Sequence, residues 1–297
     1  MNSRLQKNPI GFYELAEKTS AQELKKYYED KYYQEAKGSY ELEYTPDELK
    51  YFKVRLEQHE AVINACRPPS KTSGTKSFLD VGCGEGYAMS YFRRQGYSVR
   101  GLDFSSAGMQ SKNPECLDSL ITGDVGELLQ AEINSSKCYD VIWLQNVLEH
   151  VLDPVELLRA LRNLVSPEGI AVITVPNDCS NIQKEALERG HIDSEFWVIP
   201  PDHLSYFDNE GLANIACETG WHVMDLLGDF PIDWYLYHPG SNYVSNPSVG
   251  KDAHWARVQL ELLFSKKPIE DVLGFKRGIA KIGSGRDLTI FVTPRID

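Results

Sequence analysis

Residues 78–86 read Phe-Leu-Asp-Val-Gly-Cys-Gly-Glu-Gly and combine a carboxylate with a glycine at every second position. The carboxylate is Asp80, and the glycines are Gly82, Gly84 and Gly86. Glycine adopts positive φ easily and lets a ligand approach the main chain closely. A second acid, Asp103, lies 21 residues after Gly82, a spacing at which a βαβ unit presents a carboxylate to ribose hydroxyls. The pattern predicts a nucleoside-binding turn.

Two histidines are candidates for proton transfer, because imidazole exchanges protons near neutral pH. His150 follows the apolar run Tyr139–Gln145 closely. It can contact a substrate, act as a base, contact a cofactor or pin the start of the next helix. His203 stands beside Asp202 in Pro-Asp-His-Leu-Ser-Tyr-Phe, and a neighbouring carboxylate can orient an imidazole. We therefore favour His203 as the base.

Metal binding is a weaker alternative. His191, Asp193, Asp202 and His203 offer imidazole and carboxylate ligands for a divalent ion, but their spacing fixes no geometry, so no metal is predicted. The six cysteines lie far apart without a Cys-x-x-Cys pair. This spacing excludes the usual zinc motifs and gives no reason to infer disulfides.

Composition narrows the class of protein. The chain has 297 residues, 42% of them hydrophobic and 25% charged, and a net charge of −12, values that are ordinary for a globular protein of one or two domains. Lys and Arg form no cluster longer than two residues, which argues against nucleic acid as the main partner. We see no apolar run of about 18 residues and no signal peptide, and expect a cytoplasmic protein without a membrane span.

These residues are positioned by an alternation of strands and helices that begins near Lys76. The predicted strands are Ser77–Val81, Tyr97–Asp103, Leu120–Thr122, Tyr139–Gln145, Ile170–Val175, Trp221–Leu227 and Asp287–Val292. Such alternation predicts a doubly wound α/β fold with a parallel sheet, whose ligands bind beyond the carboxyl ends of the strands. Asp80, Asp103, Asp124 and Asn146 all fall at or just beyond these ends. Four polar side chains are thus expected at one rim.

We expect three regions along the chain. Residues 1–75 are predicted to form an N-terminal helical prelude or lid, with helices beginning at the capping boxes of Ser20 and Thr45. Residues 76–228 and 285–297 form the core. Residues 229–284 are an insertion before the last strand, serving substrate recognition, a homodimer contact or a cap on the sheet. The candidate substrate contacts are Tyr33, Asp202, Tyr206, Trp234, Asn242 and Tyr243.

A dinucleotide site would need Gly-x-Gly-x-x-Gly, whereas position 87 here is Tyr. The chain instead resembles the class I S-adenosylmethionine-dependent methyltransferases, in the small-molecule branch that includes ubiquinone-biosynthesis-type and sugar methyltransferases. The matching stretches are Leu79–Gly86, Gly101–Ser105, Gly123–Val125 and Asp140–Pro154. The resemblance implies a Rossmann-like sheet of seven strands, mostly parallel, with an antiparallel last strand.

The resemblance also implies the cofactor S-adenosyl-L-methionine and its contacts. The glycine turn would lie under the methionine part, Asp103 would take the ribose hydroxyls, and Asp124 would read the adenine amine. The remaining candidates on the cofactor side are Asp80, Cys83, Phe104, Val125, Gln145 and Asn146.

The expected activity is methylation of a small polar acceptor. O-methylation of a sugar or nucleotide sugar in surface-polysaccharide synthesis is the first hypothesis. N- or C-methylation of a quinone-like or amine metabolite is the second, and a non-catalytic S-adenosylmethionine-binding protein is the third.

Overall fold

A computed structural model describes residues 4–17, 19, 20, 22–24, 27, 43–67 and 74–295. Most of the helix predicted from Ser20, together with the candidate Tyr33, lies outside these residues. Within them, no helix is both long and apolar enough to cross a bilayer.

The central element is a seven-stranded sheet, counted over the described residues, with the order β5-β4-β3-β6-β7-β10-β9. Its strands are β3 (Ser77–Val81), β4 (Ser98–Asp103), β5 (Leu120–Thr122), β6 (Tyr139–Gln145), β7 (Val165–Pro176), β9 (Trp221–Gly228) and β10 (Asp287–Pro294). The last strand, β10, is antiparallel to both neighbours, and the pairs among β3 to β7 are parallel. The predicted Rossmann-like α/β fold is confirmed.

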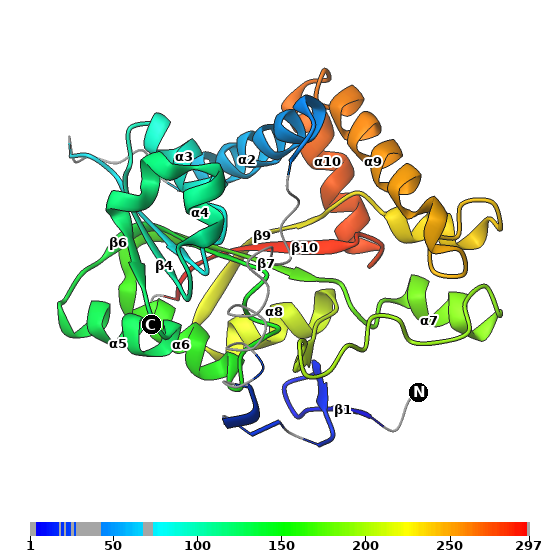
Figure 1. Ribbon diagram of the computed structural model, residues 1–297. Coiled ribbons are helices and arrows are strands. Elements are labelled where there is room, and N and C mark those ends of the chain that lie inside the picture. The colour runs from blue at the N-terminus through cyan, green and yellow to red at the C-terminus, as the bar shows by residue number, and fades with distance from the viewer. Residues whose placement is uncertain are drawn as a thin grey trace.

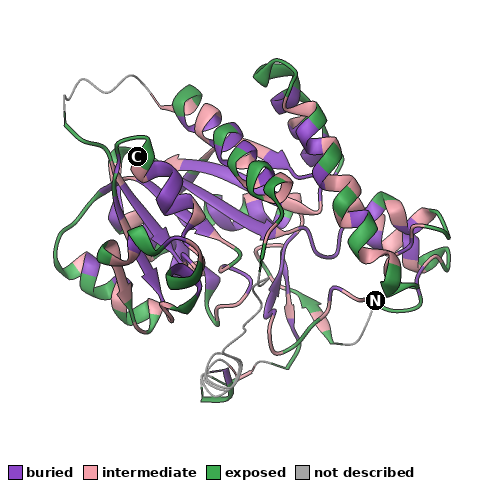
Figure 2. Ribbon diagram, turned by 45° about the horizontal axis from the view of Figure 1, so that its top comes forward, coloured by how far each residue is buried: buried purple, intermediate pink, exposed green. Residues whose placement is uncertain are grey.

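Helices cover both faces of this sheet (Figure 1). On one face lie α2 (Pro46–Cys66), α3 (Tyr87–Arg94), α4 (Ala107–Lys112) and α10 (Ile269–Lys281); on the other lie α5 (Val125–Asn134), α6 (Pro154–Leu164) and α8 (Asn209–Glu218). Alternate side chains of each strand serve the two faces: Val141 and Trp143 of β6 join one core cluster, and Ile142 and Leu144 join the other. Figure 2 shows that most residues of the strands are buried, whereas β5 and much of β9 are half-buried or exposed.

Helix α2 begins where the sequence predicts. The Thr45 hydroxyl accepts a hydrogen bond from the N–H of Glu48, and the Glu48 carboxylate accepts one from the N–H of Thr45. On the outer side of α2 packs α9 (Gly250–Phe264), through a small cluster of Tyr51 and Val54 with Val258 and Leu262.

A buried charge network also fastens the insertion to α2 and the sheet. Lys276 Nζ lies 3.1 Å from Asp229 Oδ1 and 2.8 Å from Glu261 Oε1, and Arg55 approaches Asp229 at 3.3 Å. The Arg55 and Lys276 cations hold the pKa of Asp229 far below its usual range. Because buried charges need partners, this network holds residues of the insertion in one arrangement.

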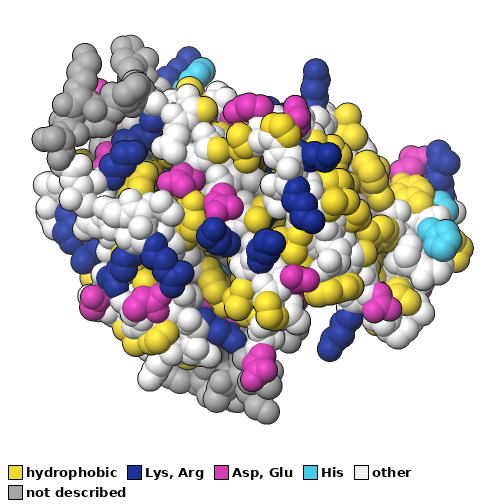
Figure 3. All heavy atoms as spheres, turned by 90° about the horizontal axis from the view of Figure 1, so that it is seen from above, with side chains coloured by type: hydrophobic (Ala, Val, Ile, Leu, Met, Phe, Trp, Pro, Cys, Tyr) yellow, Lys and Arg dark blue, Asp and Glu magenta, His cyan; other side chains and the backbone are white. Residues whose placement is uncertain are grey.

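The outer surface over α2, α9 and α10 mixes exposed apolar side chains with Lys and Arg (Figure 3). The exposed apolar residues of α9 and α10 include Leu263, Ile269 and Phe275.

The N-terminal region differs from the helical prelude that we expected. Strands β1 (Leu5–Lys7) and β2 (Tyr13–Leu15) form a second, three-stranded sheet with β8 (Ser205–Tyr206) among the described residues. Tyr13 pairs with Tyr206, and the N–H of Leu15 donates to the carbonyl of Leu204. The N-terminal strands therefore support the segment that carries His203.

Several elements follow the carboxyl ends of the parallel strands. They are α7 (Asn181–Glu188), η2 (Ile232–Tyr237) and η3 (Pro247–Val249), which lie beyond the end of β7 with one end of α9 (Figure 1).

Candidate functional site

The glycine turn after β3 has the conformation that its sequence predicts. Gly82, Gly84 and Gly86 have φ values of 72°, 51° and 77°, a region that side chains with a Cβ rarely adopt. Asp103, at the end of β4, reaches this turn: its Oδ2 accepts from the N–H of Gly84 at 2.7 Å, and its Oδ1 accepts from the N–H of Ser105 at 2.9 Å. The acid predicted to bind ribose therefore lies against the turn.

Two carboxylates are buried beside one another in this turn. Asp80 is 3% exposed and Asp103 is 7% exposed. Burial, together with the Asp103 carboxylate, raises the pKa of Asp80 well above its usual range. Burial also raises the pKa of Asp103, although its backbone donors oppose the change. A ligand that donates hydroxyl hydrogen bonds or brings a cationic group would therefore stabilise the charged form of both acids.

The turn is also in contact with the segment after β6. A Cβ on Gly82 would lie 2.4 Å from Cγ2 of Val147, so the fold requires glycine there. Asn146, one residue earlier, is exposed with a φ of 53°. The glycine turn and the segment 146–150 consequently form one continuous rim at the carboxyl edge.

The other candidates for the cofactor side lie near this rim in different environments. Asp124 is exposed and caps α5 by accepting from the N–H of Glu127. Gln145 accepts from the indole N–H of Trp143 at 3.3 Å. Cys83 is buried, and Phe104 and Val125 are half-buried.

This set of groups fits the cofactor that the resemblance implies. Backbone N–H groups and positive-φ glycines form the turn, a buried carboxylate stands at the end of β4, and an exposed acid stands after β5. Asp103 would hold the ribose and Asp124 the adenine.

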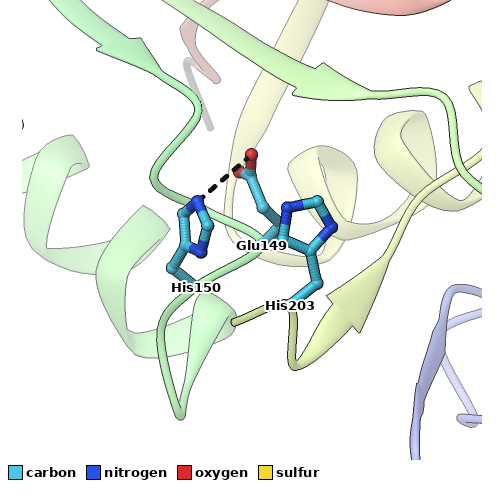
Figure 4. Close-up of side chains that lie close together, drawn as sticks. All are labelled: Glu149, His150 and His203. Atoms are coloured by element: carbon cyan, nitrogen blue, oxygen red, sulfur yellow. Dashed lines mark ion pairs between the residues drawn. The ribbon is translucent and has the colours of Figure 1, made fainter. Parts of the chain in front are cut away.

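A compact cluster of three side chains lies at the other end of the same rim. Glu149, His150 and His203 each offer a ligand or proton-binding atom, and these atoms lie within 4.8 Å of one another. Figure 4 shows the two imidazoles and the carboxylate turned toward each other, with His150 Nε2 3.7 Å from Glu149 Oε1. The two rings meet edge to face at 4.9 Å.

Backbone hydrogen bonds tie the two segments of this cluster together. The carbonyl of Glu149 accepts from the N–H groups of Leu204 and Ser205 at 2.8 and 3.1 Å. His203 is thereby fixed beside the turn that carries Glu149 and His150.

The orientation of each imidazole is set by an oxygen at Nδ1. His150 Nδ1 lies 2.6 Å from the carbonyl oxygen of Asp202, and since a carbonyl only accepts, this nitrogen carries the hydrogen. His203 Nδ1 lies 3.1 Å from Asp178 Oδ2. Both rings therefore turn Nε2 toward Glu149 (Figure 4).

The structure corrects the expected partner of His203. Asp202, its neighbour in sequence, contacts His150 instead, and Asp178 faces His203. Asp178 is 1% exposed and is itself held by Arg286 at 3.0 Å. Side chains of adjacent residues point in different directions, so adjacency did not identify the pair, and no local pattern marks Asp178 or Arg286.

Glu149 lies in the matching stretch Asp140–Pro154, where the sequence predicts no role for it, but the structure gives it a distinct environment. It is 1% exposed, and neither carboxylate oxygen has a hydrogen-bond partner among the described residues. Burial, with the carboxylates of Asp178, Asp287 and Asp202, raises the pKa of Glu149 well above its usual range.

The candidate substrate contacts of the insertion divide into two kinds. Tyr243 donates to Asp233, a buried acid that also accepts from Gln183 at 2.9 Å. Trp234 is 47% exposed and donates to Ser284. Both lie on the surface or near it, so they keep part of their side chains accessible.

Two other candidates, Asn242 and Tyr206, stabilise the backbone around them. The Asn242 amide donates to the carbonyls of His191 and Leu236 and accepts from the N–H groups of residues 244 and 245. Tyr206 is fully buried and donates to the carbonyl of His203. Tyr206 thus stabilises the backbone of His203.

The structure also changes the set of potential metal ligands that the sequence suggested. In the part of the chain that the structure describes, the cluster of potential ligands is Glu149, His150 and His203 rather than a set containing His191 and Asp193. The His191 ring packs on Tyr237 with 4.7 Å between centroids.

Comparison with known proteins agrees with this geometry. Residues 52–226 match the family described as a methyltransferase domain. Ubiquinone biosynthesis O-methyltransferase of Pectobacterium atrosepticum is 38% identical over 166 residues, which cover 52% of this chain and 68% of that protein. The protein of the same name from Pasteurella multocida is 28% identical over 194 residues, covering 58% and 78%.

Solved structures agree on the fold. A SAM-dependent methyltransferase from Archaeoglobus fulgidus aligns with a TM-score of 0.50 at 18% identity, covering 90% of this chain and 98% of that chain. The match of residues 52–226 to the family, the relatives that are 28% and 38% identical, and the glycine turn with its acids show that the chain belongs to the methyltransferase domain family and is a class I S-adenosylmethionine-dependent methyltransferase.

Proposed function

We propose that the protein O-methylates a phenolic hydroxyl of a quinone-type small molecule. The names of its relatives, ubiquinone biosynthesis O-methyltransferases, support an oxygen acceptor and a quinone-like ring. They favour this acceptor over the sugar that we put first from the sequence.

The observation that carries the proposal is the position of the imidazole–carboxylate cluster. Val147 contacts the glycine turn, and Glu149 and His150 follow within three residues. An acceptor hydroxyl bound at the cluster would therefore lie beside the cofactor cradle. Alignment of two reactants in one site supplies much of the rate enhancement of a displacement reaction.

Bound S-adenosylmethionine supplies a methyl group on a sulfonium, and transfer leaves S-adenosylhomocysteine. The acceptor forms a new C–O bond and loses its O–H proton. A neutral hydroxyl is a poor nucleophile, so a group at the site must favour its deprotonated form. His150 and His203, each oriented through Nδ1, turn their Nε2 atoms toward Glu149, and the proposal is that the acceptor hydroxyl binds there and gives its proton to one of these nitrogens.

The insertion, residues 229–284, is proposed to contact the acceptor. Tyr243 and the exposed Trp234 are its candidate contacts, and the Asp233–Gln183 pair links this region to α7. The N-terminal residues are proposed to complete the lid, and a homodimer through the insertion is the alternative role.

Acceptor panels distinguish the proposed acceptor from the alternatives. The full chain is incubated with S-adenosylmethionine and equal concentrations of a catechol, a sugar nucleotide and an aromatic amine, and S-adenosylhomocysteine is measured. We expect formation with the catechol alone. Formation with the sugar nucleotide or the amine would replace the proposed acceptor, and cofactor binding without turnover on any acceptor would favour a non-catalytic role.

A further inference from the structure

The outward face of helix α10 carries large apolar side chains that no other described element covers. Its inward face, which includes the buried Leu273 and Ile279, packs against β9 and the rest of the fold. Phe275 on the outward face is 39% exposed, and Ile282, directly after the last residue of the helix, is 63% exposed. The ring of Phe264 in α9 lies 5.6 Å from that of Phe275 and extends the apolar surface. Exposed apolar patches of this kind mark interaction surfaces.

Two glycines lie on the same outward face of α10 and serve no purpose inside the chain. Gly274 and Gly278 lower the helix propensity, and neither has a positive φ. A Cβ on either glycine would meet nothing within 4 Å, so packing of the described residues does not require glycine at these positions. They stand four positions apart and are both exposed, which places them on one side of the helix. Such glycines let the backbone of a second helix approach closely.

Two charged residues flank these glycines at equal distances. Asp271 stands three positions before the first glycine, in the first turn of α10. Lys281 stands three positions after the second glycine, in the last turn. Both side chains are exposed, and neither forms an ion pair or a side-chain hydrogen bond with another described residue. Arg277 between them is, by contrast, already paired with acids of its own chain.

We propose that the outward face of α10 is the contact surface of a homodimer, in which two copies of the helix pack antiparallel about a two-fold axis. In such a pair, a residue before the centre of one helix lies level with the residue equally far after the centre of the other. Asp271 of each copy therefore lies level with Lys281 of the other, and the glycines of both copies form the closest approach. Phe275, next to the centre, comes near its own symmetry mate. Every contact is made twice, as two-fold symmetry requires.

The charge pattern favours a second copy over other occupants of this face. The acid and the base are related by the same two-fold symmetry that relates the two glycines, so the surface is complementary to itself. Antiparallel packing also places the acidic first turn of one helix against the basic last turn of the other and pairs opposite ends of the helix dipoles. An anionic lipid surface would instead favour basic residues along the whole face, which Asp271 and the net charge of −12 oppose.

The dimer goes beyond the proposed methylation and does not depend on the acceptor. The candidate acceptor contacts Trp234 and Tyr243 come before α9 and α10 in the insertion. The first part of the insertion would then contact the acceptor, and its last helix would contact the second copy. Because association stabilises the folded chain by mass action, the midpoint of thermal unfolding should rise with protein concentration.

Sedimentation equilibrium of the full chain over a range of micromolar concentrations tests the dimer. The wild type is compared with the single reversals Asp271→Lys and Lys281→Asp, with the double reversal that combines them, and with Gly278→Gln. The control is Glu218→Lys, an exposed charge reversal in α8 on the opposite face of the sheet. Thermal melts at low concentration verify that each variant is folded.

We expect a concentration-dependent dimer for the wild type and the control. Each single reversal places like charges opposite one another at two symmetric positions and should raise the dimer dissociation constant at least about tenfold. The double reversal recreates both opposite-charge pairs and should recover most of this loss. That recovery cannot come from a more stable monomer, because both reversals oppose the helix dipole.

Gly278→Gln separates contact between chains from structure within the chain. Glutamine is a better helix former than glycine and has open space for its Cβ, so the monomer should melt no lower than the wild type. Its side chain blocks the close approach of the two helices, so the dimer should weaken by at least about tenfold.

Three outcomes would overturn the inference. They are a wild type that stays monomeric throughout, a dimer that Gly278→Gln and the single reversals leave unchanged, and a double reversal that dimerises no better than the single ones. S-adenosylhomocysteine formation is measured in the same samples. Turnover of the catechol by a monomeric wild type would reject the dimer and leave the proposed function intact, whereas a dimer without turnover on any acceptor would do the reverse.

Discussion

His203 Nδ1 lies 3.1 Å from the carboxylate of Asp178, a residue 25 positions earlier in the chain. Arg286, immediately before β10, donates to the other oxygen of that carboxylate. Three distant segments therefore fix which nitrogen of His203 faces the cluster. A small change at Asp178 is expected to disturb the function of His203 without removing it.

Replacing Asp178 with Asn tests this positioning role. The amide is isosteric but allows the wrong tautomer of His203, so we expect kcat to fall by about 10–100-fold with an unchanged dissociation constant for S-adenosylmethionine. Asp178→Glu, which retains the carboxylate, should recover part of the loss. The matched measurement is the pH profile of kcat, which a purely structural defect would leave unshifted. Equal kcat and profile for wild type and Asp178→Asn would contradict the role.

The ribose contact that we propose for Asp103 gives a second prediction. Asp103→Asn keeps the shape but removes the charge, and hydrogen bonds to charged groups contribute about 1.5–3 kcal/mol each. We expect the affinity for S-adenosylmethionine, measured by calorimetry, to fall at least about tenfold. Asp252→Asn, on the exposed side of α9, is the control and should bind normally. Unchanged affinity in Asp103→Asn would place the ribose elsewhere.

The contact between Gly82 and Val147 predicts a stability difference between two glycines of similar φ. Gly82 and Gly190 have φ values of 72° and 73°, but only a Cβ at Gly82 meets a neighbour, Val147 Cγ2 at 2.4 Å. Gly190→Ala should cost about 1–2 kcal/mol from backbone strain alone, and Gly82→Ala should cost about 1–3 kcal/mol more. Chemical denaturation measures both.

The double variant Gly82→Ala with Val147→Ala separates clash from strain. It should be more stable than expected from adding the two single changes, because the clash is absent. Strict additivity of the single changes would rule out the predicted contact.

His59 provides a prediction for pH dependence. It is 6% exposed, packs on the rings of Trp143 and Phe291, and burial with the Arg55 and Lys276 cations lowers its pKa to about 3. In the unfolded chain the pKa is about 6.5, so between these values the unfolded state binds the extra proton. Stability is therefore complete above about pH 6.5 and is lost progressively as the pH falls toward 3.

Comparison with His59→Leu isolates this contribution, because leucine does not titrate. Between pH 8 and pH 5 the wild type should lose about 2 kcal/mol more unfolding free energy than the variant. Parallel pH–stability curves for the two proteins would show that His59 is not buried in its neutral form.

Local signals in the sequence predicted much of the fold. Apolar runs ending in acids marked β3 and β4, and the Thr45 capping box marked the start of α2, because these features act over a few residues. The short strands β1 and β2 escaped prediction since three residues are too few for a period-2 pattern. Helix α10 was not predicted, because it contains Gly274 and Gly278, which lower helix propensity. Its packing on β9 offsets this unfavourable propensity in the folded chain.

The candidate site was predictable only in part, because only contacts between residues close in the sequence leave a visible pattern. The glycine turn and Asp103 belong to one βαβ unit, so their spacing is visible in the sequence. The partners of His203, Asp178 and Arg286, meet only in the folded chain. The network of Arg55, Asp229 and Lys276 joins residues more than 170 positions apart and was likewise missed.

The central claim is that a methyl group passes from S-adenosylmethionine to an acceptor oxygen at the Glu149–His150–His203 cluster. The most direct measurement uses cofactor labelled with ¹³C in the methyl group and follows the label by NMR with a catechol acceptor. The wild type should give an aryl methoxy carbon in step with S-adenosylhomocysteine, and folded His203→Asn should give almost none. Label on carbon or nitrogen, or an undiminished methoxy signal from His203→Asn, would contradict the claim.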